Sequence, residues 1–382
     1  MKLLHTSDWH IGRTFHGHSS VPALREVLEA LVATVREEAV DVVLVAGDVF
    51  DSAVPAGEHY ALLTRTLEEL RGAGAEVVLT SGNHDSPARL GFQAGLLRGS
   101  GVHVLTDPEA YAEPVVLRDA GGLEVGVYGI PYLEPALYRH RHPEESLRRH
   151  EDVLAFAMRR IRASAEAAGR HWVVLSHCFA VGAPAGTVER DITAGGIDYV
   201  SVDHFADADY AALGHVHGRA ELLPNVRYSG APLHYSFGEA AKPRGGWIVE
   251  LGADGLEDVR WSPLPVPRRL SVIEGRLDEL LADPSLAQKE PDWVSAVLTD
   301  EVRPLDAMAR LQSRFPGCVA LEHRPPSAPA AEPTAYAERI RGRSDVEIVD
   351  DFLAHVRGRG ASDAERGIVL DALAAVDAEA LR

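Results

Sequence analysis

Short apolar runs alternate with amphipathic stretches over the first 260 residues. Runs rich in β-branched residues and bounded by turn formers predict strands. Besides Leu3 and Leu4, they cover residues 41–46, 76–80, 125–130 and 172–176. The spacing of Leu24, Val27, Leu28, Leu31 and Val35 predicts a helix between the first two strands. Further helices are expected at 57–71 and 145–168, so the alternation indicates an α/β layered domain.

The pattern changes near residue 268. Expected strands at 270–273, 293–298 and 319–321, with a helix at 305–314, indicate a small α+β module. A proline- and alanine-rich stretch follows. Two capping-box patterns, Ser344 with Glu347 and Ser362 with Glu365, then predict two helices. We therefore expect a main domain at 1–267, a module at 268–323, a linker at 324–343 and a helical segment at 344–382.

The helical segment is too short to have a core of its own. It can fold back on the body of the protein or dock on a partner, and its periodicity favours neither.

Composition narrows the class of protein. The chain contains no apolar run of about 18 residues and no secretory signal pattern, so we expect a cytoplasmic protein without a membrane span. Cys178 and Cys318 do not indicate a disulfide scaffold. The formal net charge is −19, from 38 basic and 57 acidic residues. A protein that grips duplex DNA alone is usually basic, so either the ligand is not a nucleic acid or a partner supplies positive surface.

Five clusters of acidic, histidine and asparagine side chains follow or adjoin apolar runs. They are Asp8-Trp9-His10, Gly47-Asp48-Val49-Phe50-Asp51, Gly82-Asn83-His84-Asp85, Ser176-His177 and Gly214-His215-Val216-His217. Ligands of open α/β sheets bind at the carboxyl ends of the strands. In an extended segment, side chains two apart point to one side, so Asp8 with His10 and His215 with His217 can each address one site.

The residue types in these clusters are metal ligands. One Asp at a strand end is more often a cap, and a lone His is more often structural, but five such clusters together indicate a metal site. Imidazole suits zinc, iron and manganese, and oxygen ligands suit manganese and magnesium. Two cations roughly 3.5–4 Å apart need a bridging ligand, for which Asp48 is our choice.

The order D-x-H, G-D-x-x-D, G-N-H-D, H and G-H-x-H resembles the calcineurin-like metallophosphoesterases. Protein phosphatases of that superfamily fit less well, because they carry Arg-Gly where this chain has Ser52-Ala53. Finer features resemble the SbcD-like nuclease subunits of the double-strand-break repair branch. They are the segments 5–12, 195–196, 210–217, 228–233 and 236–239. The resemblance implies a four-layer αββα sandwich, a small α+β capping domain and a C-terminal helical hairpin.

The resemblance also implies two cations, Mn²⁺ first and Mg²⁺ or another divalent ion as alternatives. One would be held by Asp8, His10, Asp48 and His217, and the other by Asp48, Asn83, His177 and His215. His84 would contact the scissile phosphate or protonate the leaving 3′-oxygen, and Asp85 would orient His84. Asp51 receives no role, because relatives differ at this position.

The function implied by the resemblance is a metal-dependent DNA exonuclease and endonuclease in DNA repair and recombination. Such a subunit would work with an SbcC-like coiled-coil ATPase, as a homodimer within a heterotetramer, at the nucleoid. Candidate DNA contacts are Arg13, Arg89 and the run 139–142. An ordinary solvated charge is the more common explanation for Arg13 and Arg89, and the two explanations are equal for the run.

Two other functions remain open. A cyclic-nucleotide or other small-molecule phosphodiesterase explains the acidic charge, but it leaves residues 268–382 without a purpose. A scaffold with a structural metal site is the third reading, and it leaves His84 and Asp85 unexplained.

Overall fold

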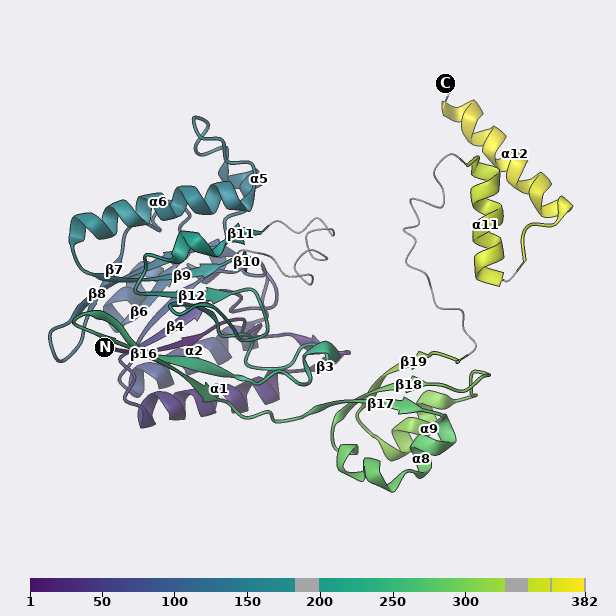
Figure 1. Cartoon of the computed structure of the whole chain (residues 1–382), viewed down its shortest axis with the longest axis horizontal. Coiled ribbons are helices and arrows are strands. Elements are labelled where there is room, and N and C mark those ends of the chain that lie inside the picture. Colours follow the sequence, from purple (N-terminus) through teal and green to yellow (C-terminus); the bar gives the residue numbers. More distant parts are fainter. Residues whose placement is uncertain (183–198, 327–342, 358, 381–382) are drawn as a thin grey trace. The chain divides into compact units, whose positions relative to one another are not determined.

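The structure is a computed structural model that describes residues 1–182, 199–326, 343–357 and 359–380. The chain divides into two compact units, Met1–Pro325 and Pro326–Arg382. The first unit contains two six-stranded sheets and a smaller three-stranded sheet. Helices lie on the outer faces of the pair of large sheets (Figure 1).

The first large sheet has the strand order β16-β15-β1-β4-β5-β6. Its strands are β1 (Lys2–Thr6), β4 (Val42–Ala46), β5 (Glu76–Thr80), β6 (Val102–Leu105), β15 (Gly245–Gly252) and β16 (Gly255–Pro263). The strands β1, β4, β5 and β6 are parallel, and β15 joins β1 antiparallel. Helices α1 (Val21–Glu37) and α2 (Gly57–Gly72) pack on one face.

The second large sheet has the order β13-β14-β12-β9-β8-β7. Its strands are β7 (Val115–Arg118), β8 (Glu124–Ile130), β9 (His171–His177), β12 (Tyr210–Gly214), β13 (Ala220–Leu223) and β14 (Val226–Tyr228). Helix α6 (His150–Ala168) packs on its outer face. The strands β8, β9, β12 and β14 are parallel.

The two large sheets pack against each other through alternating side chains. Val43 and Val45 face the helices of the first sheet, whereas Val42 and Leu44 face the second sheet. Burial on both sides explains why these strands are continuous apolar runs. The result is the expected four-layer αββα sandwich, in which β15 and β16 are additions that the sequence pattern did not predict.

Shorter elements connect these layers. They are β2 (Thr14–Phe15), β3 (His18–Ser19), β10 (Ala180–Val181), β11 (Val200–Ser201), α3 (Pro87–Leu90), α4 (Ala94–Leu97), α5 (Pro135–Tyr138), η1 (Arg98–Ser100), η2 (Val202–Phe205) and η3 (Phe237–Glu239).

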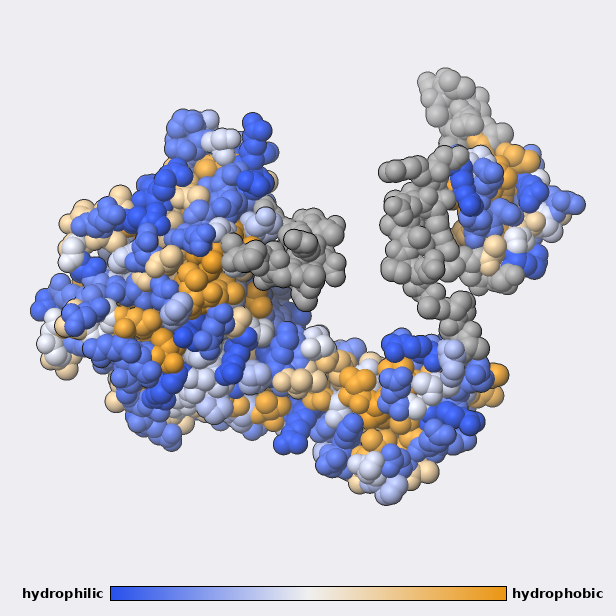
Figure 2. Space-filling model, in the orientation of Figure 1, coloured by the Kyte–Doolittle hydropathy of each residue, from blue (hydrophilic) through white to orange (hydrophobic). Residues whose placement is uncertain are grey.

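The small module has its own core. Its parallel strands are β17 (Leu270–Gly275), β18 (Trp293–Leu298) and β19 (Cys318–His323), and its helices are α8 (Leu277–Ala282), η4 (Pro284–Lys289) and α9 (Ala307–Arg314). Leu311 and Phe315 are fully buried in that core. Figure 2 shows apolar surface on the visible face of the module.

The second unit contains helices α11 (Asp345–Arg357) and α12 (Asp363–Ala380). Both predicted capping boxes form, because the Glu347 and Glu365 carboxylates accept from the backbone N–H of Ser344 and Ser362 at 2.8 Å each. Most of the linker expected at 324–343 lies outside the described residues.

One helix begins later than its pattern predicted. Helix α6 starts at His150 rather than near residue 145, because the Asp152 carboxylate accepts from the backbone N–H groups of Arg148 and Arg149 at 3.0 and 2.9 Å. Cys178 and Cys318 are both free and buried. Within the described ranges, no helix is long and apolar enough to cross a membrane.

Candidate metal centre

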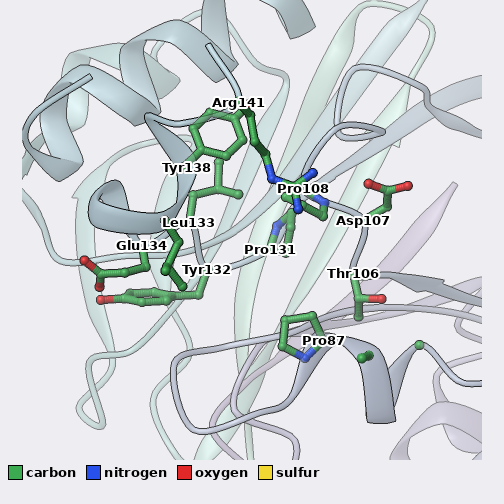
Figure 3. A pocket seen from close by; sticks show the side chains of 13 residues that line it. Pro87, Thr106, Asp107, Pro108, Pro131, Tyr132, Leu133, Glu134, Tyr138 and Arg141 are labelled. Atoms are coloured by element: carbon green, nitrogen blue, oxygen red, sulfur yellow. The ribbon is translucent and has the colours of Figure 1, made fainter. Parts of the chain in front are cut away.

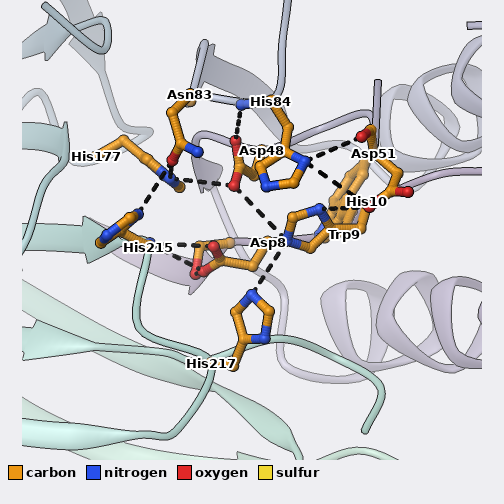
Figure 4. Close-up of polar contacts among 12 residues, drawn as sticks. Asp8, Trp9, His10, Asp48, Asp51, Asn83, His84, His177, His215 and His217 are labelled. Atoms are coloured by element: carbon orange, nitrogen blue, oxygen red, sulfur yellow. Dashed lines mark hydrogen bonds and ion pairs between the residues drawn. The ribbon is translucent and has the colours of Figure 1, made fainter. Parts of the chain in front are cut away.

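All five candidate clusters lie at the carboxyl ends of strands. In the first sheet, Asp8 follows β1, Asp48 follows β4 and Asn83 follows β5. In the second sheet, His177 is the last residue of β9 and His215 directly follows β12. The strand ends of the two sheets thus bring these side chains together in one site (Figure 4).

The backbone of these loops differs from our expectation. Asp8 and His10 have φ values of 53° and 45°, so this segment is not extended and strand alternation does not explain their convergence. Asp48 and His215 also have positive φ, at 48° and 98°. Non-glycine residues in this region cost on the order of 1–3 kcal/mol each and cluster at functional sites. Hydrogen bonds from His10 N to Asp48 O at 2.9 Å and from Asp8 N to Gly47 O at 3.1 Å hold the two loops together.

Two glycines permit the close approach of these loops. A Cβ on Gly82 would lie 2.1 Å from Asp48 Oδ1, and a Cβ on Gly214 would lie 1.8 Å from Ala46 O. A larger residue at either position would therefore push a candidate ligand or its strand out of place.

The candidate ligand atoms lie close together in two groups. His10 Nε2 is 3.1 Å from His217 Nε2. On the other side, His177 Nε2 is 3.2 Å from Asn83 Oδ1, which in turn is 3.1 Å from His215 Nδ1. The structure thus brings together all the side chains predicted to bind metal.

Asp48 lies between the two groups. Its Oδ2 is 3.6 Å from His10 Nε2 and 3.3 Å from His177 Nε2. This is the position that a bridging carboxylate requires. Triads of Asp8, His10 and His217, and of Asp8, Asp48 and His177, each have ligand atoms within 4.8 Å of one another.

The protonation pattern of the imidazoles tests whether cations fit here. Ala46 O can only accept, so His177 Nδ1 donates to it at 2.9 Å and the neutral ring has a lone pair on Nε2. That lone pair faces the Asn83 and Asp48 oxygens, which are acceptors too. Acceptors that face one another at about 3 Å repel unless a proton or cation lies between them. This position therefore requires positive charge, which a proton on His177 Nε2 supplies in the free protein and which a divalent cation fits to replace.

Burial strengthens this conclusion. Asp8 is fully buried and Asp48 is 2% exposed. Burial raises the pKa of Asp48, but the imidazoles of His177 and His10 outweigh it and hold the pKa well below its usual range. Burial lowers the pKa of His177, yet the Asp48 and Asp8 carboxylates raise it to about 9. Two buried carboxylates are costly unless positive charge compensates them.

His215 is a neutral ligand candidate. Burial, helped by the charge of His177, lowers the pKa of His215 to about 4. Its backbone N–H donates to the Asp8 carboxylate at 3.0 Å, and the Ser7 hydroxyl donates to the same carboxylate.

The contacts of Asp85 and His84 correct one expectation. The Asp85 carboxylate accepts from the backbone N–H groups of Gly82, Val49 and Phe50 at 2.8–3.0 Å, so it fixes the loops instead of orienting the His84 ring. The His84 ring is oriented by the backbone carbonyl of Asp51, which accepts from Nδ1 at 3.0 Å. Because Nδ1 is engaged, Nε2 is the ring nitrogen that can face a substrate, and the side chain is 38% exposed.

Three residues at the site had been given no role from the sequence. The Asp51 carboxylate lies 3.3 Å from His10 Nδ1, and the Glu239 carboxylate lies 3.5 Å from His217 Nδ1. The ring of Tyr235 packs edge-on against both imidazoles, with centroids 5.3 and 5.7 Å apart. Glu239 and Tyr235 belong to or adjoin segments that carried the family resemblance, but no spacing rule marks them as partners of histidines.

The candidate DNA contacts have mixed surroundings. Arg13 pairs with Asp51 at 2.9 Å and stacks over Tyr235 at 4.8 Å, so its charge is partly compensated. Arg141 lies 3.8 Å from Glu109. Arg89 is exposed in α3.

A cavity of about 470 Å³ lies beside the third cluster but is separate from the centre (Figure 3). Its wall includes Pro87, Tyr132, Tyr138 and Arg141, and it contains none of the candidate metal ligands. Because a metal-dependent reaction needs the metal ligands, we place the candidate active site at the strand ends and not in this cavity.

Three solved structures are distantly similar to this chain. The protein TT1561 of Thermus thermophilus is 15% identical with a TM-score of 0.40, over 69% of this chain and 98% of that one. GAP50 of Plasmodium, named as the anchor in the inner membrane complex, is 13% identical with a TM-score of 0.37, over 86% and 98%. A dimetal phosphatase from Danio rerio is 11% identical with a TM-score of 0.37, over 69% and 99%. Similarity at this level carries no functional argument.

Family models give a stronger result. The model SbcD_C, described as the type 5 capsule protein repressor C-terminal domain, matches residues 266–357. The calcineurin-like phosphoesterase model matches residues 1–219, which contain every candidate ligand described above. That family hydrolyses phosphoesters with divalent metal ions. Because the matched region is more than half of the 382 residues and holds the metal centre, the chain belongs to the calcineurin-like phosphoesterase family.

Proposed function

We propose that this phosphoesterase is a DNA nuclease that cleaves phosphodiester bonds with two divalent cations, as the nuclease subunit of an ATP-dependent SbcCD-like complex. The observation that carries the choice of DNA is the SbcD_C match over residues 266–357. An enzyme for small phosphodiesters does not need that region.

The residues at the strand ends divide into two ligand sets. Asp8, His10, Asp48 and His217 would hold one cation, and Asp48, Asn83, His177 and His215 the other. Two bound cations neutralise charge on the phosphate and activate water for in-line attack. Mn²⁺ is our first choice for both positions, because the sets mix imidazole with oxygen ligands.

His84 is suited to proton transfer at the leaving group. Its Nδ1–H is fixed by Asp51 O, so the proton that can be delivered to a 3′-oxygen is the one on Nε2 of the imidazolium. The backbone N–H of His84 donates to Asp48 Oδ1 at 2.9 Å. The ring therefore keeps a fixed position relative to the carboxylate that would bridge the cations.

The second unit supports the proposed partner. Helices α11 and α12 expose the large apolar side chains of Phe352, Ile368 and Leu370, at 52%, 69% and 51%. Exposed apolar side chains on short helices suit docking on a helical partner. We propose that an SbcC-like coiled-coil ATPase covers them, that it supplies positive surface for the duplex, and that the assembly is a homodimer of this chain within a heterotetramer.

The net charge of −19 favours one alternative, a cyclic-nucleotide phosphodiesterase. The Asp51–Arg13 and Glu109–Arg141 pairs point the same way, because they reduce the positive charge offered to a duplex. The two functions differ in substrate but share the metal centre.

Cleavage of linear duplex DNA and of cyclic AMP, measured side by side with Mn²⁺, separates these functions. We expect duplex cleavage, stimulated by the purified ATPase and ATP. His84→Ala should lower cleavage by about 10²–10⁴-fold while both cations stay bound. His204→Ala, which changes a histidine paired with Glu151 outside the centre, is the control and should cleave normally. Turnover of cyclic AMP without duplex cleavage would refute the choice of DNA.

A further inference from the structure

Two chains of side chains with the same order lead into the centre. Arg13 pairs with Asp51 at 2.9 Å, and Asp51 faces His10 Nδ1 at 3.3 Å. Arg244 pairs with Glu239 at 3.0 Å, and Glu239 faces His217 Nδ1 at 3.5 Å. Both chains end on the pair of imidazoles whose Nε2 atoms are 3.1 Å apart.

The chain through Glu239 is buried and tightly held. The side chains of Arg244 and Glu239 are 1% and 9% exposed. The Arg244 guanidinium also donates to the carbonyls of His217 and Ala231 at 2.5 and 2.9 Å. The Ser236 hydroxyl donates to Glu239 Oε1 at 2.9 Å. The orientation of this carboxylate is therefore fixed by several independent contacts.

The chain through Asp51 is more open. Asp51 is 29% exposed. His10 Nδ1 is buried and makes no hydrogen bond within the described part of the chain. The Asp51 carboxylate lies 3.3 Å away, so it is the acceptor in place for this nitrogen.

We propose that Glu239 and Asp51 are positioning residues that hold His217 and His10 as Nε2 ligands of one and the same cation. A carboxylate behind a metal-bound histidine fixes its tautomer and ring orientation and makes its ligand nitrogen more basic. The inference rests on the metal centre of the proposed function and not on the choice of DNA as substrate.

Among the residues that the structure describes, no carboxylate stands behind the histidines of the other cation position in this way. His177 is held by the backbone carbonyl of Ala46, and His215 Nδ1 faces the side-chain oxygen of Asn83. Removing the charge of Glu239 or Asp51 should therefore weaken the binding of one cation and leave the affinity for the other unchanged. A merely structural role would instead weaken both together or lower the stability of the fold.

The chain offers a matched control away from the centre. Glu76 lies 3.5 Å from Arg71 and 2.8 Å from His103, so it forms the same order of guanidinium, carboxylate and imidazole. Glu76 is the first residue of β5, whereas the metal centre follows the last residue of that strand. Glu76→Gln makes the same chemical change without touching a candidate ligand.

Mn²⁺ titration of the full chain, followed by calorimetry and by electron paramagnetic resonance, tests the proposal without a substrate. We expect Glu239→Gln to raise one of the two Mn²⁺ dissociation constants by about 10–100-fold and to leave the other within about twofold. The resonance signal that arises from exchange coupling between the two bound Mn²⁺ ions should decrease. Asp51→Asn should act on the same ion, and Glu76→Gln should match the wild type.

Three outcomes would overturn the proposal. They are an unchanged affinity for both ions in Glu239→Gln, an equal loss of affinity for both ions, and a loss of affinity in Glu76→Gln as large as that in Glu239→Gln. If Glu239→Gln lowers the thermal unfolding temperature, the more exposed Asp51→Asn decides alone. A wild-type chain that binds two Mn²⁺ but cuts no DNA would refute the proposed substrate and leave this inference intact.

Discussion

Gly214→Ala is the substitution for which the structure makes its sharpest prediction. Gly214 ends β12 of the second sheet, and its Cα faces the carbonyl of Ala46 at the end of β4 in the first sheet. An added Cβ would lie 1.8 Å from Ala46 O and 2.8 Å from His177 Nδ1. The same carbonyl accepts the hydrogen bond that orients His177.

The size of the effect follows from these distances. Ordinary contact begins at 3.4 Å, so the two strand ends would have to separate by about 1.6 Å, and both are buried backbone. Overpacking of this kind costs about 1–3 kcal/mol of the free energy of unfolding. A ligand displaced by about 1 Å can lower activity by about 10²-fold. We therefore expect lower stability and weaker binding of the cation that His177 holds.

Urea denaturation and Mn²⁺ titration of the purified variant measure both effects. Gly72→Ala is the matched control, because a Cβ at this helical position meets nothing within 4 Å. It should be neutral or stabilise by up to about 1 kcal/mol. If Gly214→Ala has the same urea midpoint and the same Mn²⁺ affinity as the wild type, the packing argument at the junction of the two sheets is refuted.

Three further predictions concern other parts of the chain. Burial lowers the pKa of His5 to about 3, although the hydrogen bond to Leu213 O opposes this shift, so below about pH 6.5 the unfolded chain binds a proton that the folded chain does not. The free energy of unfolding should therefore decrease by about 1.4 kcal/mol for each unit by which the pH is lowered in that range. Denaturation curves at several pH values should show a smaller slope for His5→Gln than for the wild type. Leu311→Ala should lower the free energy of unfolding of the small module by about 2–5 kcal/mol, so limited proteolysis should cut residues 268–323 first while Mn²⁺ binding persists. Loss of the module and of Mn²⁺ binding together would show that the module and the main domain unfold as one. Chelation of Mn²⁺ should lower the unfolding temperature, since each ion at about 100 times its dissociation constant stabilises by about 2.7 kcal/mol; an Asp48→Asn variant should respond less, and an equal response would place the stabilising ion elsewhere.

Much of the fold was predictable because burial dictates its pattern. The runs at 42–46 and 76–80 are buried on both faces, so hydrophobicity alone marks them as strands. The antiparallel strands β15 and β16 were not predicted. Strand β15 pairs with β1, which lies more than 240 residues earlier, and a local pattern does not encode so distant a pairing. Among the strands that the structure describes, β16 pairs only with its neighbour β15.

The candidate site was predictable in its members but not in its geometry. Acidic and imidazole groups after strands are visible as residue types, and the structure brings them together. The left-handed backbone of Asp8 and His10 depends on hydrogen bonds to the Asp48 loop, which only the folded chain supplies. The Asp85 carboxylate binds backbone N–H groups of another loop, and no spacing in the sequence reveals that preference over the neighbouring His84.

The dispersion of the ligands along the chain has a consequence for protein synthesis. The first ligand is Asp8 and the last is His217, and β15, which pairs with β1 beside Asp8, ends at Gly252. A ribosome must therefore have released roughly two thirds of the polypeptide before the two halves of the centre can meet. A nascent chain that ends before His217 lacks part of the ligand set, so we expect no hydrolytic activity from it.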